Sequence, residues 1–178
     1  MTYAAYRRIV RSKAGASAFG EEMAHKFSPS LPVDPKRVAA RLGVHVIEAP
    51  STPEDLAGAL IVRNSAATIL YNGGHPDTRQ RFTIAHELGH LMMHTRADQD
   101  QVLFRDDRSS KGTNPREIQA NAFAAALLIP EDDISKLVKE PITALHSEEL
   151  DSLARKFNVS SQAMSYRLQN LGLYTPFV

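Results

Sequence analysis

The feature that most restricts the fold of this chain is an amphipathic stretch over residues 78–95, which predicts one long helix. Apolar residues recur along one stripe of this helix, as expected where a helix packs against a core: Ile84, Ala85, Leu88, Leu91 and Met92. His86 and His90 are four residues apart, so they lie together on the other face, about one turn apart. The rest of the chain must therefore fold so that the apolar stripe is buried and the face with His86 and His90 stays available for binding.

The segment His86-Glu87-Leu88-Gly89-His90 has the spacing of a metal-binding helix. Two imidazoles one turn apart can reach a single Zn²⁺ at roughly 2.0–2.1 Å. Glu87 is displaced about 100° around the axis from His86, so we expect it to act as general base toward a water molecule at the metal. Gly89 would allow another backbone to approach closely. The competing interpretation is a solvated helix face with two ordinary histidines.

The third ligand that a catalytic zinc site needs is not fixed by this motif. His94 lies about 12 Å along the axis from His86, so it cannot share the ion and is expected beside a ligand or at the surface. Glu117 starts the next long helix and shares a face with Asn121, yet Asn114-Pro-Arg-Glu117 also resembles a capping box. Acids of the segment between the helices remain candidates without a rigid platform: Asp98, Asp100, Asp106 and Asp107.

Composition narrows the classes of function. The 178 residues fit one domain with at most a small appendage, and a formal net charge of +1 gives no bulk attraction to nucleic acid or membrane. The absence of cysteine excludes disulfides and thiolate ligands. We find neither a membrane-spanning apolar run nor a secretory signal, so no membrane partner and a cytoplasmic location are expected.

The remaining patterns predict a mainly helical α+β fold with a small antiparallel sheet. Strands are expected at 44–47 and, as a hairpin, at 58–63 and 67–71, and a long polar loop at 96–113. Asp77, with Gln80 three residues later, is expected to cap the following helix. The helices are predicted at 14–27, 35–42, 78–95, 114–130, 131–138, 147–157 and 160–171.

Two longer segments resemble the ImmA/IrrE family of metallopeptidases. The first is Arg81-Phe-Thr-Ile-Ala-His-Glu-Leu-Gly-His90 followed by His94. The second is Glu117-Ile-Gln-Ala-Asn-Ala-Phe-Ala-Ala-Ala-Leu-Leu-Ile-Pro130. The hairpin and the tail also resemble this family, so the resemblance covers about residues 35–172.

The resemblance implies a zincin-like fold with Zn²⁺ on His86, His90 and Glu117, which is a gluzincin-like ligand set. Glu87 would be the catalytic base, and Asn121 would support a ligand. Two histidines and one carboxylate can also hold Mn²⁺ or Fe²⁺. We expect a zincin-like domain with an N-terminal helical extension at 1–140 and a helix-turn-helix-like subdomain at 141–178.

The function implied by the resemblance is a limited cut in a helix-turn-helix (XRE-type) repressor, which relieves repression. The chain shows no helix-turn-helix domain upstream of the motif, so a separate repressor is the expected protein substrate. The exposed edge of the 58–71 hairpin could align an extended substrate strand. The group that stabilises the oxyanion is unassigned, and the candidates by chemistry are Tyr71, His75, His146 and Tyr166.

The tail supports a rival function, a non-catalytic metal-containing regulator that binds DNA or protein. Asn158 suits the tight turn of a helix-turn-helix. The side chains expected to face outward, toward DNA, are Ser161, Gln162, Ser165, Tyr166, Arg167 and Gln169. Only Arg155, Lys156 and Arg167 are basic, whereas strong DNA binding usually takes six to ten phosphate contacts. Packing or substrate docking is therefore the preferred role of the tail over direct DNA binding.

Overall fold

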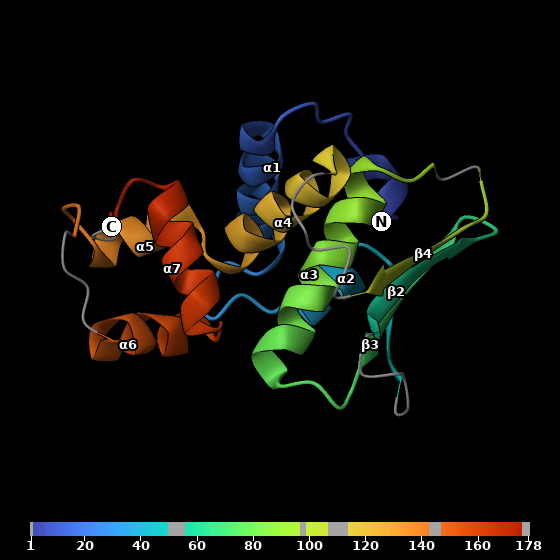
Figure 1. The fold of residues 1–178 in the computed structure, drawn as a ribbon. Coiled ribbons are helices and arrows are strands. Elements are labelled where there is room, and N and C mark those ends of the chain that lie inside the picture. The colour runs from blue at the N-terminus through green and yellow to red at the C-terminus, as the bar shows by residue number, and fades with distance from the viewer. Residues whose placement is uncertain (1, 50–55, 97–98, 107–113, 143–146, 176–178) are drawn as a thin grey trace.

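A computed structural model describes residues 2–49, 56–96, 99–106, 114–142 and 147–175 (Figure 1). The elements follow in the order η1 (Tyr3–Tyr6), α1 (Lys13–Phe27), α2 (Pro35–Arg41), β1 (His45–Ala49), β2 (Leu56–Arg63), β3 (Ala66–Asn72), α3 (Asp77–Met93), β4 (Gln101–Asp106), α4 (Pro115–Leu128), α5 (Glu131–Leu137), α6 (Ser147–Phe157) and α7 (Ser161–Asn170). The α+β class is confirmed. None of the helices in the described ranges is long and apolar enough to cross a membrane.

The sheet is mixed rather than purely antiparallel, with strand order β1-β3-β2-β4. The hairpin of β2 and β3 is confirmed, and its turn residues Asn64 and Ser65 have φ of 50° and 63°. Positive φ at both central residues matches the right-handed twist of the flanking strands. β1 runs parallel to β3, so the predicted all-antiparallel sheet is wrong at this pair. β2 follows β1 in the chain but does not pair with it. β3 lies between the two strands, with β2 on one side and β1 on the other.

The stretch 96–113, predicted as a loop, contains the fourth strand. β4 pairs antiparallel with β2, with Leu103 opposite Leu60 and Val102 opposite Ile61. Its short apolar centre is surrounded by charged residues, and backbone pairing with β2 decides its conformation despite them. β2 therefore lies between β3 and β4, and the exposed edge expected at the hairpin is wrong. The sheet edge on this side is β4.

Helices α3, α4 and α1 pack one behind another on the same face of the sheet (Figure 1). Small residues bring them close. A Cβ at Gly89 would lie 3.2 Å from Ala120 Cα, which confirms the close approach expected at this glycine, and a Cβ at Gly20 of α1 would clash with the Phe123 carbonyl oxygen. Larger residues at these positions would push the helices apart. The small side chains therefore hold α4 near α3, where the polar faces of both helices can meet.

The start of α3 differs from the prediction. Pro76 is the N-cap residue, and Asp77 belongs to the first turn without capping it. Asp77 instead accepts a hydrogen bond from Asn158 Nδ2 at 2.8 Å. The Gln80 side chain donates to the carbonyl oxygen of His75 at 2.7 Å. Tertiary contacts to the C-terminal turn and to the preceding loop have replaced the local capping box.

The C-terminal helices α6 and α7 lie where the sequence places them, and Asn158 between them has φ of 50°. The prediction that Arg167 faces outward is wrong, because its exposed fraction is 3%. Its Nε donates to the Ile129 carbonyl oxygen at 3.0 Å, and its Nη2 pairs with the Glu21 carboxylate. One of three basic groups is thus removed from any DNA-facing surface. The helix-turn-helix character and the division at residue 140 stay predictions.

Candidate metal centre

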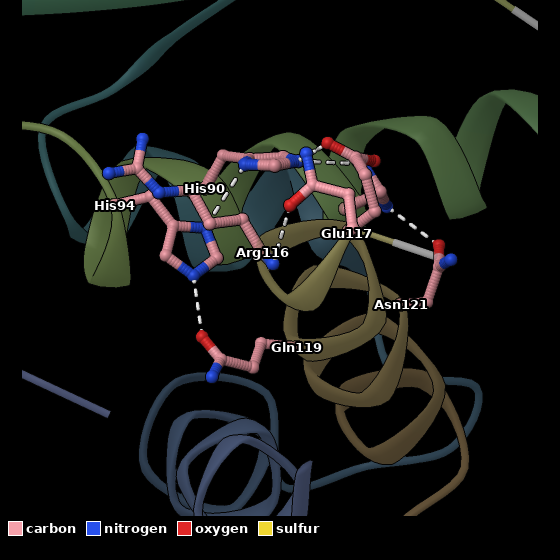
Figure 2. Close-up of polar contacts among 8 residues, drawn as sticks. His90, His94, Arg116, Glu117, Gln119 and Asn121 are labelled. Carbon is pink, nitrogen blue, oxygen red and sulfur yellow. Dashed lines mark hydrogen bonds and ion pairs between the residues drawn. The ribbon is translucent and has the colours of Figure 1, made fainter. Parts of the chain in front are cut away.

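Three polar side chains from two helices meet beside the sheet. His86 and His90 come from α3, and Glu117 comes from the first turn of α4. Figure 2 shows His90 and Glu117 next to each other. The two Nε2 atoms are 3.0 Å apart. Glu117 Oε2 lies 3.2 Å from His86 Nε2, and Glu117 Oε1 lies 3.1 Å from His90 Nε2. One donor atom from each residue therefore points at a common centre.

The donor set fits a divalent metal ion. Bonds of 2.0–2.1 Å to a tetrahedral zinc place neighbouring donor atoms ~3.3 Å apart, close to the separations found here. His86 is 1% and His90 7% exposed, and hydrogen bonds from His86 and His90 lower the pKa of the Glu117 carboxyl far below its usual value. A carboxylate held ionised between two imidazoles is a ready acceptor for a cation.

Further side chains hold the rings of both histidines. His86 Nδ1 lies 2.8 Å from Asn121 Oδ1 and donates to it, so a neutral His86 ring would present an unprotonated Nε2 to a metal ion in place of its contact with Glu117. His90 Nδ1 lies 3.1 Å from His94 Nδ1, and His94 Nε2 lies 2.9 Å from Gln119 Oε1. Burial lowers the pKa of His94. His94 is thus a neighbour of His90 and is too far along the helix to join the cluster.

Glu87 borders the same cavity without joining the cluster. It is 1% exposed, and a cavity of about 400 Å³ opens in front of it. The cavity has one wall from α3, one from the beginning of α4 and one from the edge strand β4. The lining residues are His86, Glu87, His90, His94, Gln101, Val102, Leu103, Asn114, Arg116 and Glu117. A carboxylate at this place can accept a proton from a water molecule beside the cluster.

Among the candidate acids whose side chains the structure describes, Glu117 is the one that lies at the histidines. Asn114 caps α4 by accepting from the Arg116 N–H at 3.0 Å, while the Glu117 carboxylate lies against the two histidines. Asp100 accepts from the Asn64 N–H instead. Asp98 and Asp107 lie outside the described residues, as does the side chain of Asp106.

Several residues of the cavity were not predicted from the sequence. Arg116 precedes Glu117 and lines the cavity together with Gln101 and Leu103 of β4. Its position next to a candidate ligand in the first turn of a helix was the available signal. The sequence held no comparable signal for Gln101 and Leu103, because the strand that carries them was not predicted.

Three of the four suggested oxyanion groups lie outside the cavity lining. The Tyr71 hydroxyl accepts from Lys36 and donates to Glu48. Neither Tyr71, His75 nor Tyr166 is among the lining residues, and Tyr166 is 58% exposed on α7. His146 lies outside the described residues. No candidate from the sequence therefore occupies the oxyanion position, within the part of the chain that the structure covers.

Two packed helices that present a His-His-Glu cluster beside an edge strand define a candidate metalloprotein with an open cavity at its metal centre. The chain belongs to the family described as IrrE N-terminal-like domain, Peptidase_M78, whose profile matches residues 39–169. Membership of this family supports a metallopeptidase-type function, and it confirms the resemblance found in the sequence.

Similar proteins agree with this assignment. Metallopeptidase ImmA of Bacillus subtilis (strain 168) is 30% identical over 96 residues, 54% of this chain and 53% of that protein. Uncharacterized immunity region protein 2 of Bacillus phage phi105 is 29% identical over 98 residues, 48% of this chain and 60% of that protein. The alignments thus span little more than half the length of these relatives.

A solved structure shares the fold. It is described as a Mycobacterium tuberculosis transcriptional regulator, with a TM-score of 0.54 and 16% identity, and the match covers 88% of this chain and 46% of that one. At this identity the likeness concerns the arrangement of helices and strands alone.

Proposed function

We propose that this chain is a zinc-dependent endopeptidase of the cytoplasm that makes a limited cut in a helix-turn-helix (XRE-type) repressor and so relieves repression. The observation that carries the proposal is the convergence of His86, His90 and Glu117 next to the buried Glu87 in one open cavity. We assign His86, His90 and Glu117 as metal ligands and Glu87 as the catalytic base. Mn²⁺ and Fe²⁺ also suit this donor set.

Each residue has a defined part in the proposed hydrolysis. A bound divalent ion would polarise the scissile carbonyl and lower the pKa of a water molecule. Glu87 accepts the proton of the attacking water and delivers it to the leaving amine. Its burial, at 1% exposure, keeps bulk water away from this carboxylate during the transfer.

The cavity wall on β4 suggests how a substrate is held. β4 pairs only with β2 among the described strands, so its other edge offers free backbone donors and acceptors. An extended substrate segment would pair with Gln101–Leu103 by strand addition and lie across the cluster. Arg116, on the opposite wall, would contact a substrate carbonyl or carboxylate.

A repressor as substrate is supported by the regulatory context of the relatives, one of which is named an immunity region protein. The alternative is a non-catalytic regulator that keeps a metal for stability. Such a protein would have no need of a buried carboxylate at the cavity, and Glu87 is one. Burial of Arg167 leaves Arg155 and Lys156 as the basic groups of the tail that face solvent, which weakens the DNA-binding version.

The test compares wild type with Glu87→Gln. Zinc-loaded protein is incubated with a panel of purified XRE-type repressors, and the products are identified by mass spectrometry. Loss of the general base should lower the cleavage rate by about 10²–10⁴-fold, with one zinc per chain retained. Glu140→Gln, an exposed glutamate far along the chain, serves as the matched control and should cleave at the wild-type rate.

The outcomes separate the two functions. Cleavage that is unchanged in Glu87→Gln would show that the assigned base is wrong. A zinc-loaded wild type that cuts none of the repressors would favour the regulator. A single cut in one repressor, absent in Glu87→Gln, would establish the proposed activity and give its site.

A further inference from the structure

We propose that Gln119 and His94 act in series as positioning residues for His90, fixing the ring tautomer in which His90 Nε2 is available to the metal. This inference rests on the metal centre of the proposed function. It assigns a role to Gln119, which lies two residues beyond Glu117 on α4. Figure 2 shows Gln119 pointing at His94 and Asn121 pointing at the other end of the cluster.

Three contacts link Glu117, His90, His94 and Gln119 in a row. Only one assignment of donors and acceptors along this row leaves His90 Nε2 available to a metal. His90 Nδ1 and His94 Nδ1 are 3.1 Å apart, so one of them must donate and the other accept. If His90 Nδ1 accepted, the proton of the neutral His90 ring would sit on Nε2, 3.1 Å from Glu117 and in the place of the metal. With a metal ion on His90 Nε2, His90 Nδ1–H must therefore donate to His94 Nδ1.

The direction of the first contact fixes the second. A neutral His94 whose Nδ1 accepts carries its proton on Nε2, which lies 2.9 Å from Gln119 Oε1. The amide oxygen of Gln119 accepts this proton. An amide turned the other way would present an N–H, which would reverse both contacts and place a proton on His90 Nε2. Gln119 thus sets a tautomer two hydrogen bonds away.

Both positioning residues are held by rigid structure. The backbone N–H of His94 donates to His90 O at 2.8 Å at the end of α3, so its ring has a fixed origin one turn from His90. Gln119 is half-buried on α4, which packs tightly on α3 through Gly89 and Ala120. Glu117, Gln119 and Asn121 all belong to α4, so one helix supplies a ligand together with the groups that orient both ligand histidines.

The two histidines are consequently oriented by different means. His86 donates directly to an amide oxygen, that of Asn121 at 2.8 Å, whereas His90 reaches an amide oxygen only through His94. Outer hydrogen-bond partners of this kind typically change metal affinity by about 10–100-fold when they are removed. Removal of Gln119 should therefore weaken metal binding without removing any ligand.

The experiment measures the zinc affinity of the full chain by competition with a chromogenic chelator. Gln119→Leu should bind zinc about tenfold more weakly than wild type, and His94→Phe should bind at least as weakly as Gln119→Leu. Gln119→Glu keeps an acceptor oxygen and should retain wild-type affinity to within a few-fold. Gln162→Leu, the same change at an exposed position of α7, controls for a general effect of the substitution.

Two further readouts separate positioning from mere packing. In the double variant His94→Phe/Gln119→Leu the affinity should equal that of His94→Phe alone, because Gln119 acts through His94. In zinc-loaded protein labelled with ¹⁵N-histidine, the His94 signals should show a protonated Nε2 and an unprotonated Nδ1. His94→Phe identifies the His94 signals by their loss.

Several results would overturn the inference. These are wild-type affinity in Gln119→Leu, additive losses in the double variant, or a His94 ring protonated at Nδ1. Because the readouts need no cleavage, zinc binding with the expected pattern but no peptidase activity would refute the proposed function and leave this inference intact. A wild type that binds no zinc would refute the metal centre and the inference together.

Discussion

The helices α3 and α4 and the helices α6 and α7 use their polar residues in opposite ways. In the first pair, His86, Glu87 and His90 are buried and directed at a shared cavity. In the second pair most polar side chains face solvent, and the buried Arg167 is bound by the Ile129 carbonyl oxygen and by Glu21. Burial of polar groups raises the free energy of the fold unless they are paired. The two pairs of helices differ in what their buried polar groups pair with.

The comparison shows which buried polar residues indicate chemistry. Arg167 has protein partners that accept its donors, so it contributes to packing between α7, α1 and the end of α4. The cluster on α3 and α4 brings three donor atoms to one point, where two imidazole nitrogens and a carboxylate have a cation as their natural partner. The first arrangement is complete as protein, whereas the second suits the divalent metal ion that we propose for it.

The largest expected effect tests the cluster itself. His90→Ala removes one of three assigned ligands, so zinc affinity should fall by more than the roughly 10–100-fold expected for an outer partner. The measurement is zinc per chain after dialysis against a weak chelator. His25→Ala, at a solvent-exposed position of α1, is the control. Zinc retained at full stoichiometry in His90→Ala would show that the cluster is structural, like Arg167.

The next effect tests the structural assignment of the second pair. Arg167→Leu leaves the Ile129 carbonyl oxygen and the Glu21 carboxylate without their donor, and breaking such a pair should lower the free energy of unfolding by about 3 kcal/mol. Urea denaturation of the metal-free protein measures it. Arg155→Leu, at an exposed position, should change stability by less than about 0.5 kcal/mol. Unchanged stability in Arg167→Leu would contradict the structural role of Arg167 and favour a role in binding.

A smaller effect is expected at Arg116, which lines the cavity without belonging to the cluster. Arg116→Gln removes a cation from the wall facing β4, and the cleavage rate at low substrate concentration should fall roughly fivefold. Zinc content should not change, because no ligand is altered. A variant that loses zinc instead would indicate that Arg116 supports the ligand helix rather than the substrate.

The smallest effect is predicted for the remaining basic groups of the tail. Changing Arg155 and Lys156 together to Ser should leave stability within about 0.5 kcal/mol and zinc content unchanged. Gel-shift assays at low salt should detect no DNA complex that this double variant abolishes. A salt-sensitive complex that disappears in the variant would instead support the DNA-binding regulator.

The sequence by itself determined the features that depend on neighbouring residues. Periodicity placed α3, α4, α6 and α7, and the two strand patterns of the hairpin placed its turn at Asn64 and Ser65. The i,i+4 spacing put His86 and His90 on one face, because helix geometry is the same in every fold. Such features need no knowledge of what packs against them.

Tertiary structure decided everything that depends on which elements meet. β4 forms because β2 offers a free edge, although the surrounding charges predict a loop. Asp77 accepts from Asn158 instead of capping α3, and Arg167 is buried against Ile129 instead of facing solvent. In both cases a partner distant in sequence outweighs the conformation that the neighbouring residues favour. Spacing alone could not choose between cap and ligand for Glu117, since the choice depends on α4 packing against α3 closely enough for its carboxylate to lie between two imidazoles.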